Sequence, residues 1–147
     1  MALHLVPPIH RATHRIGLYL ADREHGLSQG EAHILAHLAT SAPATIAELH
    51  ADLAHKRSTL TSILDRLTTR GLITRMVGDE DRRTFVIDMT AKGRKLAAQV
   101  HADLTALEDA VGRRVTERQV LAFLKVLSVV EDVAQKTTVA AEGCVHI

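Results

Sequence analysis

The sequence predicts a mainly α-helical fold with one small β-hairpin, an α+β fold of four helices, the hairpin and two long helices. Three features support this prediction. The capping-box pattern, a Ser or Thr followed three residues later by Glu or Gln, occurs at Ser28–Glu31, Thr45–Glu48 and Thr116–Gln119. Apolar side chains then recur every three or four residues, as on one face of a helix. The period changes between residues 72 and 88, where two β-rich runs flank a charged turn.

The first two helices are expected before residue 42. The first runs from about residue 9 to 25, with apolar side chains at helical spacing, and Gly26 would end it. The second begins behind the cap Ser28 and should stop near Thr40, because Pro43 cannot continue a helix.

The next two helices are predicted over residues 45–54 and 56–70, with almost nothing between them. Such close spacing is what a helix-turn-helix requires. Gly71 stands where a left-handed residue would end the second of them. The apolar face of this second helix is expected to consist of Leu60, Ile63, Leu64 and Leu67.

The hairpin and two long helices complete the chain. The runs 72–77 and 84–88 are the predicted strands, and the hairpin follows directly where a wing would sit. Thr90 and Thr116 then begin the long helices. The apolar stripe of the last helix is too wide for one isolated helix. It could pack within the chain or against a second subunit.

Composition and charge limit the function classes. A chain of 147 residues suits one ordinary domain. The single cysteine, Cys144, excludes an intrachain disulfide, and neither a membrane span nor a secretory signal is recognisable, so a cytoplasmic location is expected. Residues 56–95 carry ten Lys and Arg against five Asp and Glu, a net +5, while each flank is −2. A basic centre between acidic flanks is expected of a chain whose centre meets phosphates, although a charge excess is as often just a solvated face.

The polar face of the helix over 56–70 is the best candidate for this contact. It is rich in small hydroxyls and cations. Short side chains let the backbone approach a major groove, hydroxyls bond to phosphates and base edges, and Arg can fork onto a guanine. A merely solvated helix is the alternative, but such a face would more often use better helix formers than Ser and Thr. The members of this face are Lys56, Ser58, Thr59, Thr61, Ser62, Asp65, Arg66 and Thr69.

The hairpin tip has two readings of about equal weight. Arg82 or Arg83 could enter a narrow minor groove while Asp81 holds the loop. Alternatively, the tip is an acid-rich turn with local salt bridges.

Taken together, these residues resemble the MarR family of bacterial winged helix-turn-helix transcription regulators over roughly residues 16–133. Order, spacing and the Asp-Arg-Arg wing all match. The matching runs are LSQ at 27–29, ILAHL at 34–38, TIAEL at 45–49, KRSTLTSILDRL at 56–67, RGLI at 70–73, DEDRR at 79–83 and MTAKG at 89–93.

The resemblance implies a homodimer that binds a pseudo-palindromic operator on double-stranded DNA, in most members as a repressor. It implies an N-terminal dimerisation helix at 1–26, a winged helix-turn-helix at 27–95 and C-terminal dimerisation helices at 96–147. Arg83 would be the wing-tip residue with Asp81 positioning it, and Arg75 a phosphate contact. The residues assigned to DNA are Lys56, Arg57, Ser58, Thr59, Thr61, Ser62, Arg66, Arg75, Asp81, Arg82 and Arg83.

Control by a small aromatic or phenolic effector is also implied by the resemblance. Cations and histidines near the first two helices could hold a carboxylate or phenolate beside Tyr19. The candidate effector residues are Arg11, His14, Arg15, Tyr19, His33 and His37. Sensing by Cys144 is not expected, because no basic residue lies near it in sequence and a reactive thiol needs an electropositive site.

Three other functions compete with this one. The pairs His10/His14 and His33/His37 have the i, i+4 spacing of metal ligands and could make the regulator respond to metal or pH, although ten histidines produce such pairs by chance. A winged-helix module could dock only proteins, but that would not need a hydroxyl-rich face and the arginine tip together. No catalytic or phosphate-loop motif is present, so neither an enzyme nor a cofactor is predicted.

Overall fold

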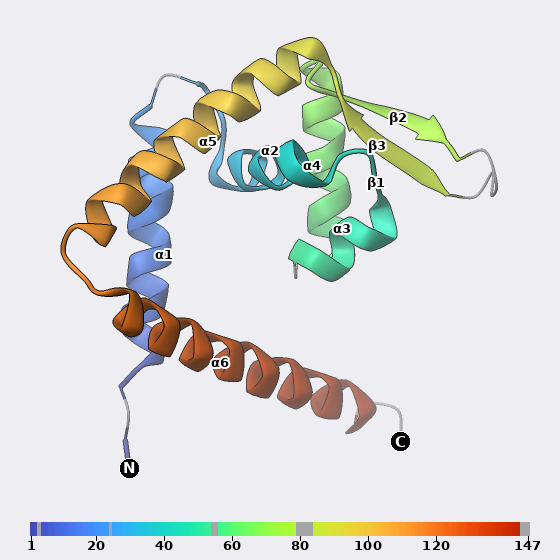
Figure 1. Cartoon of the computed structure of the whole chain (residues 1–147). Helices are drawn as coiled ribbons and strands as arrows, with labels where there is room; N and C mark the ends of the chain where they lie inside the picture. The colour runs from blue at the N-terminus through green and yellow to red at the C-terminus, as the bar shows by residue number, and fades with distance from the viewer. Residues whose placement is uncertain (3, 24, 54–55, 79–83, 145–147) are drawn as a thin grey trace. The chain divides into compact units, whose positions relative to one another are not determined.

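The computed structural model describes all residues except 3, 24, 54–55, 79–83 and 145–147, and beyond residue 137 it describes the backbone alone. The chain forms two compact units, Met1–Thr105 and Ala106–Ile147. Helices and one small sheet make up the described fold, which confirms the predicted fold class (Figure 1). The elements are α1 (Val6–Ala21), α2 (Gln29–Ser41), β1 (Ala44–Thr45), α3 (Ile46–Leu53), α4 (Arg57–Thr69), β2 (Ile73–Val77), β3 (Phe85–Met89), α5 (Ala91–Gly112) and α6 (Glu117–Cys144).

The predicted capping boxes are all formed. At the start of α2 the Ser28 hydroxyl accepts the Glu31 amide at 3.2 Å, and the Glu31 carboxylate accepts the Ser28 amide at 3.2 Å. Reciprocal pairs of bonds also begin α3, at Thr45–Glu48, and α6, at Thr116–Gln119. Each box gives partners to two backbone amides that a helix start would otherwise leave unpaired.

Helix α1 differs from its prediction at both ends. It begins at Val6, because prolines in the first turn lose no helical hydrogen bond and already have the required φ. It ends at Ala21, four residues before the expected position, and Gly26 with φ +65° lies in the following loop. This loop turns His25 into the interior, where the residue is only 7% exposed.

The end of α4 sets the position of the wing. Gly71 has φ +72°, a conformation that costs other residues roughly 1–2 kcal/mol. The Leu72 amide donates to the Leu67 carbonyl, and the Gly71 amide to that of Thr68, which together close a Schellman motif. The start of α5 packs on this turn so closely that a Cβ at Gly93 would collide with the Leu72 carbonyl.

The sheet has the order β1-β3-β2, and both strand pairs are antiparallel. The predicted hairpin is formed by β2 and β3, with Ile73 opposite Met89 and Val77 opposite Phe85. Strand β1 was not predicted, because two residues are too few to show a periodic pattern. It pairs with β3 and so connects the turn before α3 to the hairpin.

The core of the first unit lies where α2, α3 and α4 meet the sheet. Leu38, Leu49 and Leu64 are fully buried, as are most of the apolar positions predicted for these helices. Each such side chain contributes roughly 1.5–3 kcal/mol by its burial. The core therefore holds α4 through one face and leaves its other face to solvent.

Within the described residues, no helix is both long and apolar enough to cross a bilayer.

Helix α6 exposes an unusual amount of apolar surface. It continues to Cys144, beyond the predicted apolar stripe. Several of its large side chains are between 38% and 60% exposed, and single soluble chains rarely leave a continuous apolar surface of this kind uncovered. These side chains are Val120, Leu121, Phe123, Leu124, Val126, Val129 and Val133.

Candidate nucleic-acid interface

The solvent face of α4 carries the predicted polar residues. Residues 56–59 lie at its start and are exposed, with Lys56 as the N-terminal cap, and Thr61, Ser62 and Arg66 follow on the exposed side. The Thr61 hydroxyl donates to the Arg57 carbonyl at 2.9 Å. Its oxygen keeps lone pairs for an outside donor, as the other hydroxyls on this face do.

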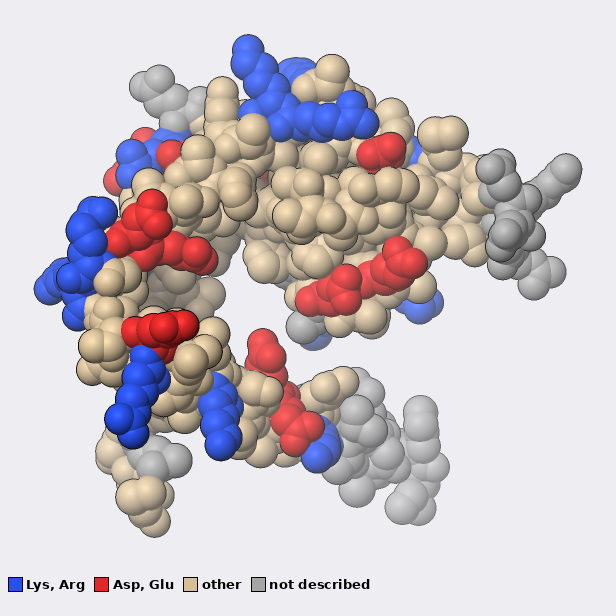
Figure 2. Space-filling model, in the orientation of Figure 1, with Lys and Arg blue, Asp and Glu red and all other residues tan. Residues whose placement is uncertain are grey.

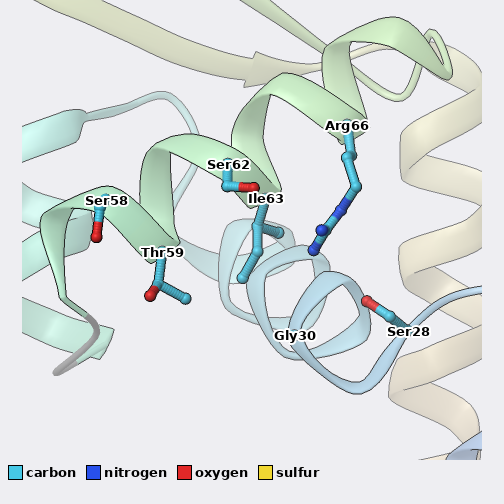
Figure 3. Close-up of a pocket in the computed structure, with 7 residues that line it drawn as sticks. All are labelled: Ser28, Gly30, Ser58, Thr59, Ser62, Ile63 and Arg66. Atoms are coloured by element: carbon cyan, nitrogen blue, oxygen red, sulfur yellow. The ribbon is translucent and has the colours of Figure 1, made fainter.

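Part of this face forms one wall of an open hollow of about 440 Å³ (Figure 3). Ser58, Thr59, Ser62 and Arg66 line it from α4, above the buried side chain of Ile63. The opposite wall comes from the start of α2, where Ser28 and Gly30 lie. The polar groups that line the hollow are therefore hydroxyls and one guanidinium, beside apolar surface that includes Ile63.

The wing base is tied to α4 by an ion pair. Arg75 on β2 donates from its Nη2 to the Asp65 carboxylate at 2.7 Å. The Nε of Arg75 is buried, and no described residue accepts a hydrogen bond from it. Arg75 is thus held beside α4, where its side chain is 28% exposed, and Asp65 orients it.

A second ion pair joins the end of α4 to the start of α2. Arg70 Nη1 donates to Glu31 at 2.9 Å, and the Glu31 side chain is only 8% exposed. Burial raises the pKa of the Glu31 carboxyl, but hydrogen bonds from Ser28 and Arg70 outweigh it and hold the pKa below its ordinary value of 4.5. The carboxylate is therefore ionised at neutral pH and holds the two helices in register.

The wing is described only up to its tip. The Gly78 amide donates to the Thr84 carbonyl at 2.8 Å, which continues the pairing of β2 and β3 toward the loop. The predicted wing-tip residues Asp81, Arg82 and Arg83 lie outside the described residues. Their roles stay predictions.

Charge is unevenly distributed over the first unit. Figure 2 shows Lys and Arg side chains gathered over the start of α5, where Lys92, Arg94 and Lys95 are exposed. Acidic side chains lie over α3, where Glu48 and Asp52 are exposed. Because an acidic face repels phosphate, the outer surface of α3 is a poorer nucleic-acid contact than that of α4.

The candidate effector residues lie on α1 and α2. Arg11, His14 and Arg15 are exposed on α1. The Tyr19 hydroxyl donates to the Asp103 carbonyl of α5 at 2.9 Å, and its ring lies 4.3 Å from the Arg23 guanidinium carbon. None of the six candidate effector residues lines the hollow between α2 and α4.

The two histidines of α2 differ in exposure. His33 is exposed, whereas His37 is half-buried and its Nε2 lies 3.3 Å from the Asp52 carboxylate on α3. Across the described part of the chain, no three His, Cys, Asp or Glu side chains come close enough to hold a metal ion.

Sequence reasoning missed three residues of this surface as site members. Ser28 was assigned only a capping role, Gly30 no role at all, and Asp65 was not linked to Arg75. Their positions depend on how α2 and the wing pack against α4, and no local pattern encodes that packing.

The central region of the chain matches a known protein family. Residues 27–85 match the model of the MarR family. No curated protein matches the sequence. The matched region includes the whole candidate surface from Ser28 to the start of β3.

Solved structures share the fold at low sequence identity. A mutant of MarR from E. coli, complexed with operator DNA, gives a TM-score of 0.72 at 23% identity, covering 86% of this chain and 90% of that one. The transcriptional regulator BldR from Sulfolobus solfataricus gives 0.72 at 24%, covering 86% and 94%. Bordetella bronchiseptica BpsR, whose DNA binding is regulated by 6-hydroxynicotinic acid, gives 0.74 at 17%, covering 88% and 94%.

These structures share the mainly helical fold with a small antiparallel sheet, and the family model covers the helix-turn-helix and most of the wing. Residues 27–85 therefore match the MarR family, and the chain as a whole shares the fold of these transcription regulators.

Proposed function

We propose that this protein is a transcription regulator that binds a pseudo-palindromic operator on double-stranded DNA as a homodimer, and that it acts as a ligand-responsive repressor. The observation that carries the proposal is the exposed face of α4, with its hydroxyls and Arg66, beside a wing base held by Arg75 and Asp65. An α-helix of this width fits the major groove of B-DNA.

The residues divide into three groups by role. The hydroxyls of Ser58, Thr59, Thr61 and Ser62 would contact base edges and phosphates, because short side chains bring the helix close to the groove floor. The cations Lys56, Arg57 and Arg75 would neutralise phosphates. Asp81, Arg82 and Arg83 would place an arginine in the adjacent minor groove. The E. coli MarR mutant complexed with operator DNA supports DNA binding by a chain of this fold.

The dimer would form through the helices outside the winged module, residues 1–26 and 96–147. The exposed apolar side chains of α6 support this assignment, because a second copy would remove them from water. A dimer also explains why an operator with two half-sites is expected.

An aromatic effector would act near α1 and α2, through Arg11, His14, Arg15, Tyr19, His33 and His37. The regulation of BpsR by 6-hydroxynicotinic acid supports an acidic aromatic compound as the first class to test. If His33→Ala and Arg15→Ala both leave the response to every releasing compound intact, this placement is wrong.

A mobility-shift assay on DNA from the region upstream of the coding sequence tests the function. A shift that resists unspecific competitor, contains two subunits and weakens steeply with salt is expected. Equal competition by unrelated DNA at every salt concentration would contradict sequence-specific binding.

A further inference from the structure

The hollow between α2 and α4 has a role that the recognition of bases does not cover. We propose that it receives a backbone phosphate of the bound DNA, held by Arg66 and the hydroxyls around it. Arg66 would then supply affinity and register and not base recognition. This inference rests on the proposed function, because it assumes that α4 docks in the major groove.

The first argument is the direction of Arg66. In Figure 3 its side chain runs from α4 toward Ser28 at the start of α2, across the hollow. Ser58, Thr59 and Ser62 line the same side one or two turns earlier. A guanidinium fork together with hydroxyl donors is the group of side chains that proteins use for phosphate oxygens.

The second argument is the balance of charge. Two carboxylates are sequence neighbours of residues that line the hollow, and each is paired with an arginine. Glu31, which shares the capping box with Ser28, is paired with Arg70 at 2.9 Å. Asp65, next to Arg66 in sequence, is paired with Arg75 at 2.7 Å. Among the described residues Arg66 has no such partner, so its positive charge is available to an anion.

The third argument is the space itself. Gly30 leaves the hollow open, since a Cβ there would lie 2.8 Å from Ile63 Cδ1. Ile63 is one of the lining residues, so a longer side chain at position 30 would enter the hollow. The volume of about 440 Å³ is ample for one phosphate group.

The fourth argument is the geometry of the duplex. The major groove is about 12 Å wide, close to the diameter of a helix with its side chains, so a helix in the groove has a phosphate backbone along each flank. Residues that project outward from α4 meet base edges. The start of α2 lies along one flank of α4, and a group held there meets the backbone.

The test compares Gly30→Glu with Gly30→Gln, two side chains of the same size that differ in charge. Binding is measured by fluorescence anisotropy on a duplex with the preferred site and on an unrelated duplex. We expect Gly30→Glu to bind both duplexes at least about tenfold more weakly than Gly30→Gln, because its carboxylate repels the phosphate. Equal affinities of the two variants would overturn the proposal.

Arg66→Ala gives a second, independent readout. It should weaken binding to both duplexes alike and reduce the slope of log affinity against log salt by about one. A loss confined to the preferred site, with relaxed choice of a single base pair, would mean that Arg66 reads a base and would overturn the proposal.

Ethylation interference needs no variant at position 30, and it decides the matter if both Gly30 variants fail to fold by circular dichroism. Ethylation of one phosphate in each half-site should block the wild type and have no further effect on Arg66→Ala. Identical interference patterns for the two proteins would overturn the phosphate proposal. If the wild type still binds its preferred site specifically, the proposed function is unaffected by that result. If the wild type binds no duplex specifically, both are overturned.

Discussion

The buried carboxylate of Glu31 should be worth more to stability than any other helix-capping glutamate described in this chain. Glu31→Ala removes the reciprocal bond of a capping box and also the charged hydrogen bond from Arg70 at 2.9 Å. A cap contributes about 0.5–2 kcal/mol and a hydrogen bond to a charged group about 1.5–3 kcal/mol. The free energy of unfolding should therefore fall by about 2–4 kcal/mol.

Glu48→Ala is the matched control. Glu48 occupies the same position of the capping box that begins α3, but it is exposed, so its loss should cost only about 0.5–1 kcal/mol. Urea denaturation at one fixed protein concentration measures both, and the midpoint should shift while the m-value stays unchanged. A double-mutant cycle with Arg70→Ala should give a coupling energy of about 1 kcal/mol or more. If Glu31→Ala costs no more than Glu48→Ala, the ion pair between α2 and α4 does not stabilise the module.

Three further predictions follow from the same structure. The pKa of Glu31 is lowered in the folded state, so the stability that its ionised carboxylate contributes is complete above pH 4.5 and is lost as the pH falls through the folded pKa. The difference in unfolding free energy between wild type and Glu31→Gln should therefore shrink in acid titrations, and a difference that widens would contradict this prediction. Arg75→Ala should weaken binding to specific and unrelated duplexes alike, measured by anisotropy, whereas a selective loss at one base pair would refute its assignment to phosphate. If the proposed dimer forms through α6, Leu124→Glu should convert it to a monomer in light scattering, while Lys125→Glu on the polar side of α6 should not. A dimer in both variants would refute this interface.

Much of the fold was predictable because its signals are local. The capping boxes at Ser28, Thr45 and Thr116 each involve residues three apart, so the sequence contains the complete pattern. The change from helical to alternating period likewise identified the hairpin. Gly71 was expected at the end of α4 because few other residues tolerate its positive φ.

What sequence reasoning missed depends on tertiary packing. The end of α1 at Ala21 follows from the burial of His25 against Asp103, 3.4 Å away on α5, which no local pattern shows. The Asp65–Arg75 pair joins a helix to a strand, and the hollow beside Gly30 exists only after α2 packs on α4. The polar face of α4 was predictable because it is a local pattern. Which part of that face borders α2 and which part is open to solvent was not.

The most direct test of sequence-specific binding is a selection from random duplex DNA with the purified protein, followed by sequencing of the bound fraction. The account predicts enrichment of an inverted repeat whose half-sites are centred about one helical turn apart, roughly 10 bp. A bound fraction with no enriched sequence, at salt concentrations where unspecific binding is weak, would contradict it.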